Sequence, residues 1–448
     1  MCRELFVVAL QPEARTSPPL RIQFNGAMLI RRAPAVATFI AAAAIVIVAA
    51  QAPGWLAAHH DAAPAEVVPS RVRDPWLWQA TVGQHPVGPA SVLFFTAHTR
   101  YFESTGVVVG RDGGYRLLPI GVGEGHGLLS PDGQWYLRPG TGSLVDLRTG
   151  DERPTHQPRL HPLAWSPDGK LVLATRNNDD AVITYGPDNQ QLNDPPKPDD
   201  LLTVDPWSGV ERVLPVGTFA SHSAATWSPD GSLLAVAGPA DPAAQIAERE
   251  RLVVADPSGG GVRWQVELGE RRRLAGRSAW SPDGRRIALL AYDGCATRCA
   301  DTAEMLRRSW RIEFLDAATG RPVGDAIPVS GSAVELVAWR SGDPVVKRQS
   351  PEADHEKRHT ALAAVSARGG DQVLLTTPNG VSDLVVPGDL LDRAAFGGPE
   401  PRPSPFAAPP WLYATLAVPL LLAVLALVRW QRRRSASNGG DRGLTHRS

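Results

Sequence analysis

A four-residue turn sequence, Ser-Pro-Asp-Gly, recurs four times in this chain and constrains its fold more than any other feature. Proline presets φ at the second position of a turn, aspartate bonds to the backbone, and glycine accepts a positive φ. Apolar runs such as LVLAT at 171–175 and LLAVA at 233–237 follow the turns, so each copy predicts a β-hairpin. The residues expected to shape these hairpins are Trp165, Asp168, Gly169, Trp227, Asp230, Gly231, Trp280, Asp283 and Gly284.

A second kind of turn follows each hairpin. An apolar strand leads into an aspartate, a short turn and a glycine, as in LVDLRTG at 144–150 and LTVDPWSG at 202–209. A further strand follows most copies, so each unit is predicted to be four antiparallel strands with two tight turns. Four-stranded sheets that repeat radially form a β-propeller, in which neighbouring blades cover each other's faces. The predicted fold class is therefore all-β.

The Trp-Ser-Pro-Asp-Gly core and the apolar strand after it resemble the repeats of the TolB-type, WD-repeat-like β-propeller family, over roughly residues 90–395. Leu129 replaces the tryptophan of the first copy, and a degenerate fifth copy at Trp339 lacks the proline. The dipeptide that marks true WD repeats is absent. The resemblance implies a propeller that serves interaction rather than catalysis.

The copies of the core account for five blades. A sixth is expected from both ends of the repeat region, with a worn hairpin at 381–391 joined by strands at 91–96, 106–114 and 115–120. This closure would seal the sheet edge that an open array exposes. We expect six blades, with seven as the alternative.

Two apolar segments flank the repeats and predict membrane helices. Residues 34–56 follow two arginines, while residues 411–428 carry no charge and precede four arginines. About 20 apolar residues span a bilayer core, and basic flanks favour the cytoplasmic side. Both termini are therefore expected in the cytoplasm and the propeller outside it. The alternative for the first segment is a cleaved signal peptide.

The expected organisation follows from these boundaries. It comprises a cytoplasmic tail at 1–33, a transmembrane helix or signal anchor at 34–56, a stalk at 57–89, an extracytoplasmic propeller at 90–395, a Pro-rich linker at 396–410, a transmembrane helix at 411–428 and a basic cytoplasmic tail at 429–448.

The connections between the second and third strands of each blade are long and unlike each other, and they fall on the face opposite the short turns. Irregular loops on a rigid scaffold are where binding residues concentrate, so the interaction surface is expected there, near the central channel. Cys295 and Cys299 lie in one such loop, and an exported location favours a local disulfide over a metal or redox pair.

His355, Glu356 and His359 match the spacing H-E-x-x-H, which binds zinc when it lies on a helix. In this chain the segment lies in a polar loop with no third ligand evident. We therefore predict a solvated loop there, and no metal or cofactor for the protein.

The formal net charge of zero gives no basic field that would favour nucleic acid. We expect a membrane-anchored binding scaffold of the cell envelope, without enzymatic activity. Its partner would be an envelope protein, a peptide or a glycan, and the lipid bilayer would hold it. The alternatives are a metal-dependent propeller hydrolase or lyase, which would bring inward-facing His, Asp and Glu together at the channel mouth, and an accessory sensor subunit.

Overall fold

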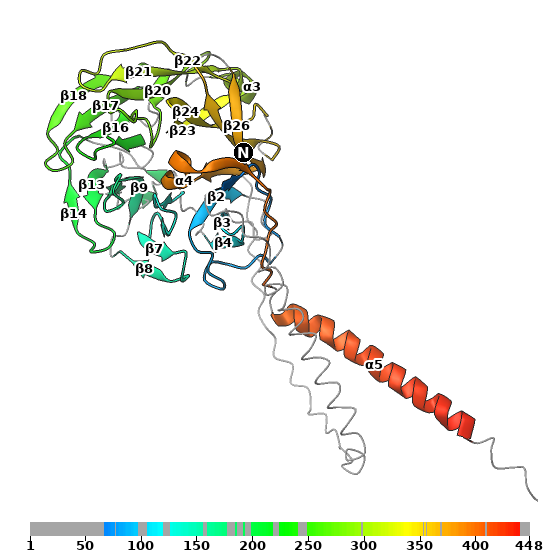
Figure 1. Cartoon of the computed structure of the whole chain (residues 1–448). Coiled ribbons are helices and arrows are strands. Elements are labelled where there is room, and N and C mark those ends of the chain that lie inside the picture. Colours follow the sequence, from blue (N-terminus) through cyan, green and yellow to red (C-terminus); the bar gives the residue numbers. More distant parts are fainter. Residues whose placement is uncertain are drawn as a thin grey trace, which may run out of the picture. The chain divides into compact units, whose positions relative to one another are not determined.

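The computed structural model of this chain contains six four-stranded antiparallel sheets, which Figure 1 shows arranged around a common centre. It describes residues 67–439 except 77, 97–104, 120–125, 156–158, 177–183, 186–190, 193–198, 218–223, 241–248, 297–298, 353, 355, 368–369 and 408–409. The predicted segments 1–33 and 34–56 lie outside the described residues.

In blades 1 to 3 the strands follow one another from the innermost to the outermost. Blade 1 comprises β5 (Leu128–Leu129), β6 (Trp135–Leu137), β7 (Ser143–Asp146) and β8 (Glu152–Pro154). Blade 2 comprises β9 (Leu160–Trp165), β10 (Val172–Arg176), β13 (Asp200–Val204) and β14 (Glu211–Val213). Blade 3 comprises β15 (Ala224–Trp227), β16 (Leu234–Pro239), β17 (Glu250–Ala255) and β18 (Val262–Glu267).

Blades 4 to 6 complete the ring. Blade 4 comprises β19 (Arg272–Leu274), β20 (Arg286–Asp293), β21 (Ser309–Asp316) and β22 (Ile327–Val329). Blade 5 comprises β23 (Ser332–Arg340), β24 (Asp343–Gln349), β25 (His359–Val365) and β26 (Asp371–Asn379). Blade 6 comprises β27 (Val381–Val385), β2 (Ala90–Thr96), β3 (Thr105–Gly110) and β4 (Tyr115–Pro119).

Blade 6 closes the ring with strands from both ends of the repeat region. The inner strand β27 pairs antiparallel with β2, with Leu93 opposite Val385 and Phe94 opposite Leu384. The prediction of six blades closed in this way is confirmed. The expected second strand of the worn hairpin is replaced by a short helix, α4 (Gly388–Arg393), because β2 already occupies the position beside β27.

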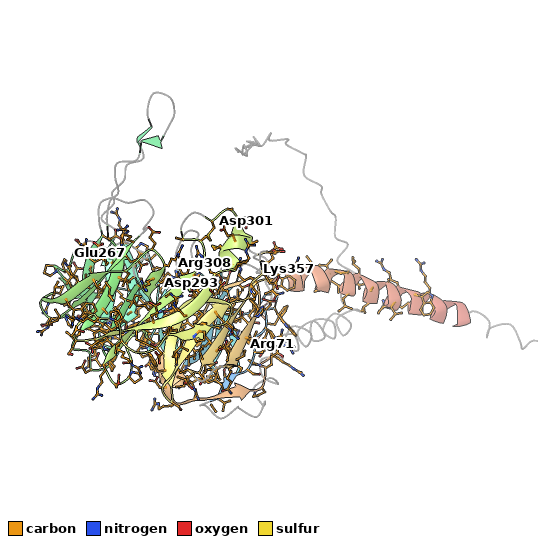
Figure 2. All side chains as sticks on the ribbon, turned by 90° about the horizontal axis from the view of Figure 1, so that it is seen from above. Arg71, Glu267, Asp293, Asp301, Arg308 and Lys357 are labelled. Atoms are coloured by element: carbon orange, nitrogen blue, oxygen red, sulfur yellow. A yellow bond between two sulfur atoms is a disulfide. The ribbon has the colours of Figure 1, made fainter. Side chains whose placement is uncertain are left out.

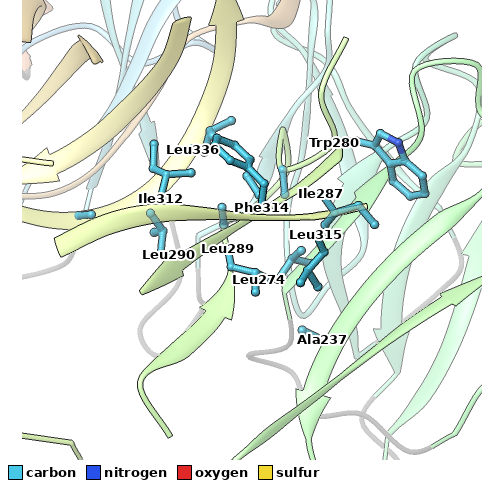
Figure 3. Packing of buried hydrophobic residues seen from close by; sticks show 14 of the residues in the cluster. Ala237, Leu274, Trp280, Ile287, Leu289, Leu290, Ile312, Phe314, Leu315 and Leu336 are labelled. Atoms are coloured by element: carbon cyan, nitrogen blue, oxygen red, sulfur yellow. The ribbon is translucent and has the colours of Figure 1, made fainter. Parts of the chain in front are cut away.

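Each blade buries both of its faces, as β2 illustrates. Val92 and Phe94 belong to the apolar cluster shared with blade 5, whereas Leu93 and Phe95 belong to the cluster shared with blade 1. Successive side chains of a strand point to opposite faces, so one apolar run supplies two inter-blade cores. Figure 3 shows another of these cores, which joins strands of blades 3, 4 and 5.

The segment expected to form a stalk differs from that expectation in its described part. Residues 67–76 and 78–89 lie against blades 5, 6 and 1, with Val68, Val72 and Ala80 buried. β1 (Val67–Pro69) pairs in parallel with β28 (Ala395–Gly398). β28 begins one residue before the expected linker and continues into it. The linker in turn bonds to blade 6, since Tyr115 donates its backbone N–H to the carbonyl of Ser404. The apolar residues at 68, 72 and 80 follow neither the strand period nor the helix period, so the sequence did not predict this packing.

Three further elements lie outside the blades. They are the hairpin of β11 (Thr184–Tyr185) and β12 (Gln191–Leu192), the short helix α3 (Thr302–Leu306), and the helix α5 (Pro410–Gly439), which contains the segment 411–428. Among the residues that the structure describes, no helix meets the length and apolarity needed to cross a membrane. The side chains of residues 411–414 and 416 of α5 are outside that described set.

Candidate functional site

The short turns lie on one face of the propeller, and those of blades 1 to 4 are nearly identical. In the turn at 228–231, the Ser228 hydroxyl donates to Asp230 (2.6 Å) and accepts the backbone N–H of Leu233 (2.9 Å). The turns at 130–133, 166–169 and 281–284 repeat both bonds. The closing glycines Gly133, Gly169, Gly231 and Gly284 have φ between 70° and 73°. Ser228 therefore holds the pKa of Asp230 down, at about 2.

Trp165 and Trp227 end the inner strands of their blades, and Trp280 lies beyond the inner strand β19, in an isolated bridge with Ile287. The indole of Trp227 donates to the carbonyl of Ala164 in the preceding blade (3.4 Å). The indole of Trp280 donates within its own turn, to Gly284 (3.0 Å). Trp165 is half-buried and packs against the core between blades 1 and 2. Asp168 and Asp283 accept serine hydroxyl bonds as Asp230 does, so these repeat residues serve the scaffold.

The opposite face carries the long connections and is called the loop face below. The connections run from Arg176 to Asp200, from Pro239 to Glu250, from Asp293 to Ser309 and from Gln349 to His359. In the edge-on view of Figure 2, the labelled residues Asp301 and Glu267 lie toward the same side of the propeller. A shallow hollow of about 600 Å³ opens on this face between blades 3 and 4. Its charged lining consists of Arg249, Glu267, Glu270, Arg271 and Arg272.

Glu250 and Arg273, each next in sequence to a lining residue, carry buried polar atoms. Arg273 places its guanidinium over the Trp310 ring, 4.9 Å from the ring centroid, and donates to the carbonyl of Ala333 (2.8 Å). Glu250 Oε2, Arg273 Nε and Trp310 Nε1 are buried with no hydrogen-bond partner among the described residues. Burial raises the pKa of Glu250 and lowers the pKa of Arg273.

The structure places a disulfide between Cys295 and Cys299, on the loop face of blade 4. Arg308 fixes this loop. Its Nε donates to the carbonyl of Cys295 (2.9 Å), and its guanidinium lies over the Tyr292 ring, 4.3 Å from the centroid. The loop is thus tied both to itself and to blade 4.

The H-E-x-x-H segment lies in the connection from β24 to β25. His355 is outside the described residues. Glu356 is exposed in a turn, where its backbone N–H donates to Asp354 (3.0 Å), and His359 begins β25. A turn does not give the one-face spacing that a helix gives to residues four apart. Among the described residues, no three His, Cys, Asp or Glu side chains gather in a way that could hold a metal ion.

A buried ionic network that the sequence did not predict joins blades 4, 5 and 6 to His126 at the centre of the propeller, and we call it the central network. Lys347 Nζ lies 2.7 Å from Glu335 Oε2 and 2.5 Å from Asp383 Oδ1. Arg277 Nε lies 2.9 Å from Glu335 Oε1, and His126 Nδ1 lies 3.3 Å from Asp383 Oδ2. These groups come from blade 4 (Arg277), blade 5 (Glu335 and Lys347) and blade 6 (Asp383), with His126 just before blade 1.

The charges in this network balance each other. Burial alone would raise the pKa of Glu335, but Arg277 and Lys347 outweigh it and hold that pKa at about 2. Burial would likewise raise the pKa of Asp383, yet Lys347 and a hydrogen bond from His126 hold it well below its usual range. The same carboxylates raise the pKa of Lys347 against the effect of its burial. Both carboxylates are therefore anionic and neutralised in place.

One signal in the sequence could have pointed to the network. Lys347 is one of four lysines in the chain, and it ends an apolar strand run, PVV, at 344–346. Glu335 and Asp383 likewise interrupt apolar runs. Charged residues at buried strand positions demand partners, although the sequence does not say which blade supplies them.

The fold and these sites define the chain as a six-bladed β-propeller with four matching turns on one face and varied, charged connections on the other. No protein-family model matches the sequence, and no match is found among curated proteins.

Solved structures with a similar fold include TolB from Acinetobacter baumannii, at 13% identity, a TM-score of 0.43, and coverage of 68% of this chain and 67% of that one. A putative TolB from Agrobacterium tumefaciens has 18% identity, a TM-score of 0.39, and coverage of 65% and 90%. An oligogalacturonate lyase in complex with manganese has 16% identity, a TM-score of 0.40, and coverage of 68% and 77%. All three likenesses concern the fold alone.

Proposed function

We propose that this propeller is a binding scaffold whose partner docks on the loop face, over the hollow between blades 3 and 4. The observation that carries the proposal is the hollow of about 600 Å³ with its lining of arginines and glutamates. The mixed charge of this lining favours a protein or peptide partner with complementary charge.

The central network supports binding over catalysis. His126, Glu335 and Asp383 do converge, as a hydrolase or lyase would require. However, a general base works best with a pKa near the working pH, whereas the pKa of Glu335 is about 2. Lys347 also lies within 2.7 Å of both carboxylates, so it occupies the positions from which they would bind a metal ion.

We propose further that α5 tethers the propeller to a lipid bilayer from the extracytoplasmic side. The segment 411–428 carries no charge, and four arginines follow it within six residues. Several of its described apolar side chains are exposed, namely Val418, Leu420, Leu421, Leu422, Leu425 and Leu427. Exposed leucines on consecutive turns need an apolar environment, and acyl chains supply one. Carbonate extraction of cell membranes tests this proposal, since release of the full chain into the soluble fraction would contradict it.

The docking proposal is tested by photo-crosslinking in intact cells. A photoreactive amino acid replaces Arg271 on the loop face or Arg285 on the turn face, where the side chain is also exposed. We expect a discrete adduct from position 271 that is lost when Arg249→Glu and Arg272→Glu are added. No adduct from position 271, or the same adduct from both positions, would contradict the proposal.

A further inference from the structure

Trp207 lies exposed on the turn face, in a turn that does not need it. Its side chain is 48% exposed. Asp205 Oδ1 accepts the backbone N–H of Trp207 (2.8 Å), and the Ser208 hydroxyl donates to Asp205 Oδ2 (2.7 Å), so aspartate and serine stabilise the turn. The equivalent position in the other units is Arg148, Ser258 or Ala318. The indole therefore has no structural task in the turn itself.

The indole of Trp207 is held in a defined position by a second tryptophan across the seam between blades 1 and 2. The Trp135 ring centroid lies 4.8 Å from that of Trp207, with the two ring planes at 80°. Trp135 is half-buried against the core of the two blades, which fixes it. The Arg153 guanidinium of β8 lies over the Trp135 ring, 5.7 Å from its centroid. The result is a corner of two indoles with a cation at its side, which we call the Trp corner.

The size of the Trp corner favours a small ligand over a protein surface. A tryptophan side chain offers about 200 Å² of surface, so Trp207 exposes roughly 100 Å² of it. Val210, three residues further along the chain, is also exposed, at 67%. A stable protein partner covers about 800 Å² on each side, several times what this corner presents.

We propose that the Trp corner binds a glycan, with a pyranose ring stacked on Trp207 and an oxygen of the sugar accepting from Arg153. A pyranose ring has an apolar C–H face and a polar rim, which matches an exposed indole beside a guanidinium. The guanidinium is planar with several N–H donors and suits a carboxylate better than a hydroxyl. The Trp corner lies on the face opposite the hollow, so this inference is independent of the proposed docking function.

Two related sugars separate the contributions of ring stacking and charge. Chitobiose is neutral, whereas the disaccharide of N-acetylglucosamine and N-acetylmuramic acid has the same number of rings and adds a carboxylate. We expect the full chain to bind both, with millimolar or tighter affinity, in titration calorimetry and saturation-transfer NMR. Because Arg153 can pair with the carboxylate, the muramic acid sugar should bind several-fold more tightly.

Matched variants locate the binding. Trp207→Ala should weaken both sugars at least tenfold, and Arg153→Gln should remove the preference for the carboxylate while neutral binding persists. Trp76→Ala is the control, because Trp76 is also exposed, at 61%, but lies outside the Trp corner. Failure of both sugars to bind at 10 mM would overturn the proposal, as would binding that survives Trp207→Ala or is lost equally in Trp76→Ala. Capture of a protein by a photo-crosslinker at position 207, with no sugar binding, would also overturn it.

Discussion

Replacing Glu335 by glutamine tests whether the central network holds the blades together. The substitution keeps the side chain's shape but removes the charge that Arg277 and Lys347 share, at 2.9 and 2.7 Å. The pKa of Glu335 falls from 4.5 to about 2 in the folded protein. At 1.36 kcal/mol per pKa unit, this difference corresponds to about 3 kcal/mol of stability near neutral pH. Breaking one partner of a buried pair typically costs about 3–5 kcal/mol, which agrees.

The sign of the pH dependence follows from the direction of the shift. A carboxyl group whose pKa is lowered by folding stabilises the folded state above pH 4.5, and this stabilisation is lost as pH falls toward 2. Denaturant titrations of the wild type and Glu335→Gln should therefore differ by about 3 kcal/mol at pH 7 and by roughly half of that at pH 3.

Two further variants serve as controls for this test. Glu400→Gln removes the exposed ion pair with Arg73 and should cost less than about 1 kcal/mol. Adding Lys347→Met to Glu335→Gln removes one cation with one anion, so the double variant should lose less stability than the sum of the single variants. A loss for Glu335→Gln no larger than for Glu400→Gln, with unchanged pH dependence, would refute the reasoning.

Three other predictions concern the scaffold. Gly231→Ala places an L side chain at φ +73° and should lower the free energy of unfolding by about 1–2 kcal/mol in denaturant titration. Gly259→Ala adds its methyl group to open space and should lower it less. Equal losses of stability would contradict this account of the turn. Trp264→Phe removes a 2.9 Å indole hydrogen bond to the next blade and should lower stability by about 1–2 kcal/mol; no change would mean that the bond contributes nothing. Cys295→Ser should speed tryptic cleavage after Arg308 several-fold, because the disulfide no longer holds in place the carbonyls that bind Arg308. Reduction of the wild type should have the same effect. Unchanged cleavage would show that the disulfide does not order the loop.

The fold could be predicted because its information is local and repeated. The Ser-Pro-Asp-Gly turns carry their own hydrogen bonds, as Ser228 and Asp230 show, so each copy specifies one hairpin wherever it stands. The closing strand at 381–385 was recognisable because residues 381–391 resemble a degenerate copy of the same hairpin. The position of the long connections then follows from strand order alone.

The sites could not be predicted because they depend on contacts between blades. Glu335 and Arg277 are 58 residues apart in sequence and belong to different blades, so only the folded ring brings them together. Trp207 reads as one more residue of a turn until Trp135 of the preceding blade is seen beside it. The packing of residues 67–89 was missed because their apolar residues show neither a strand nor a helix period.

Disulfide trapping between β2 and β27 tests the central claim, a six-bladed ring closed by both ends of the repeat region. Leu93 and Val385 are register partners in blade 6. In a full chain carrying Leu93→Cys and Val385→Cys, mild oxidation should join these positions, and mass spectrometry of the digest should recover the linked peptides. A control pair of Leu93→Cys with Val373→Cys, which lies on the outer strand of blade 5, should stay unlinked. Free thiols at both positions 93 and 385 in a folded, oxidised protein would contradict the closed ring.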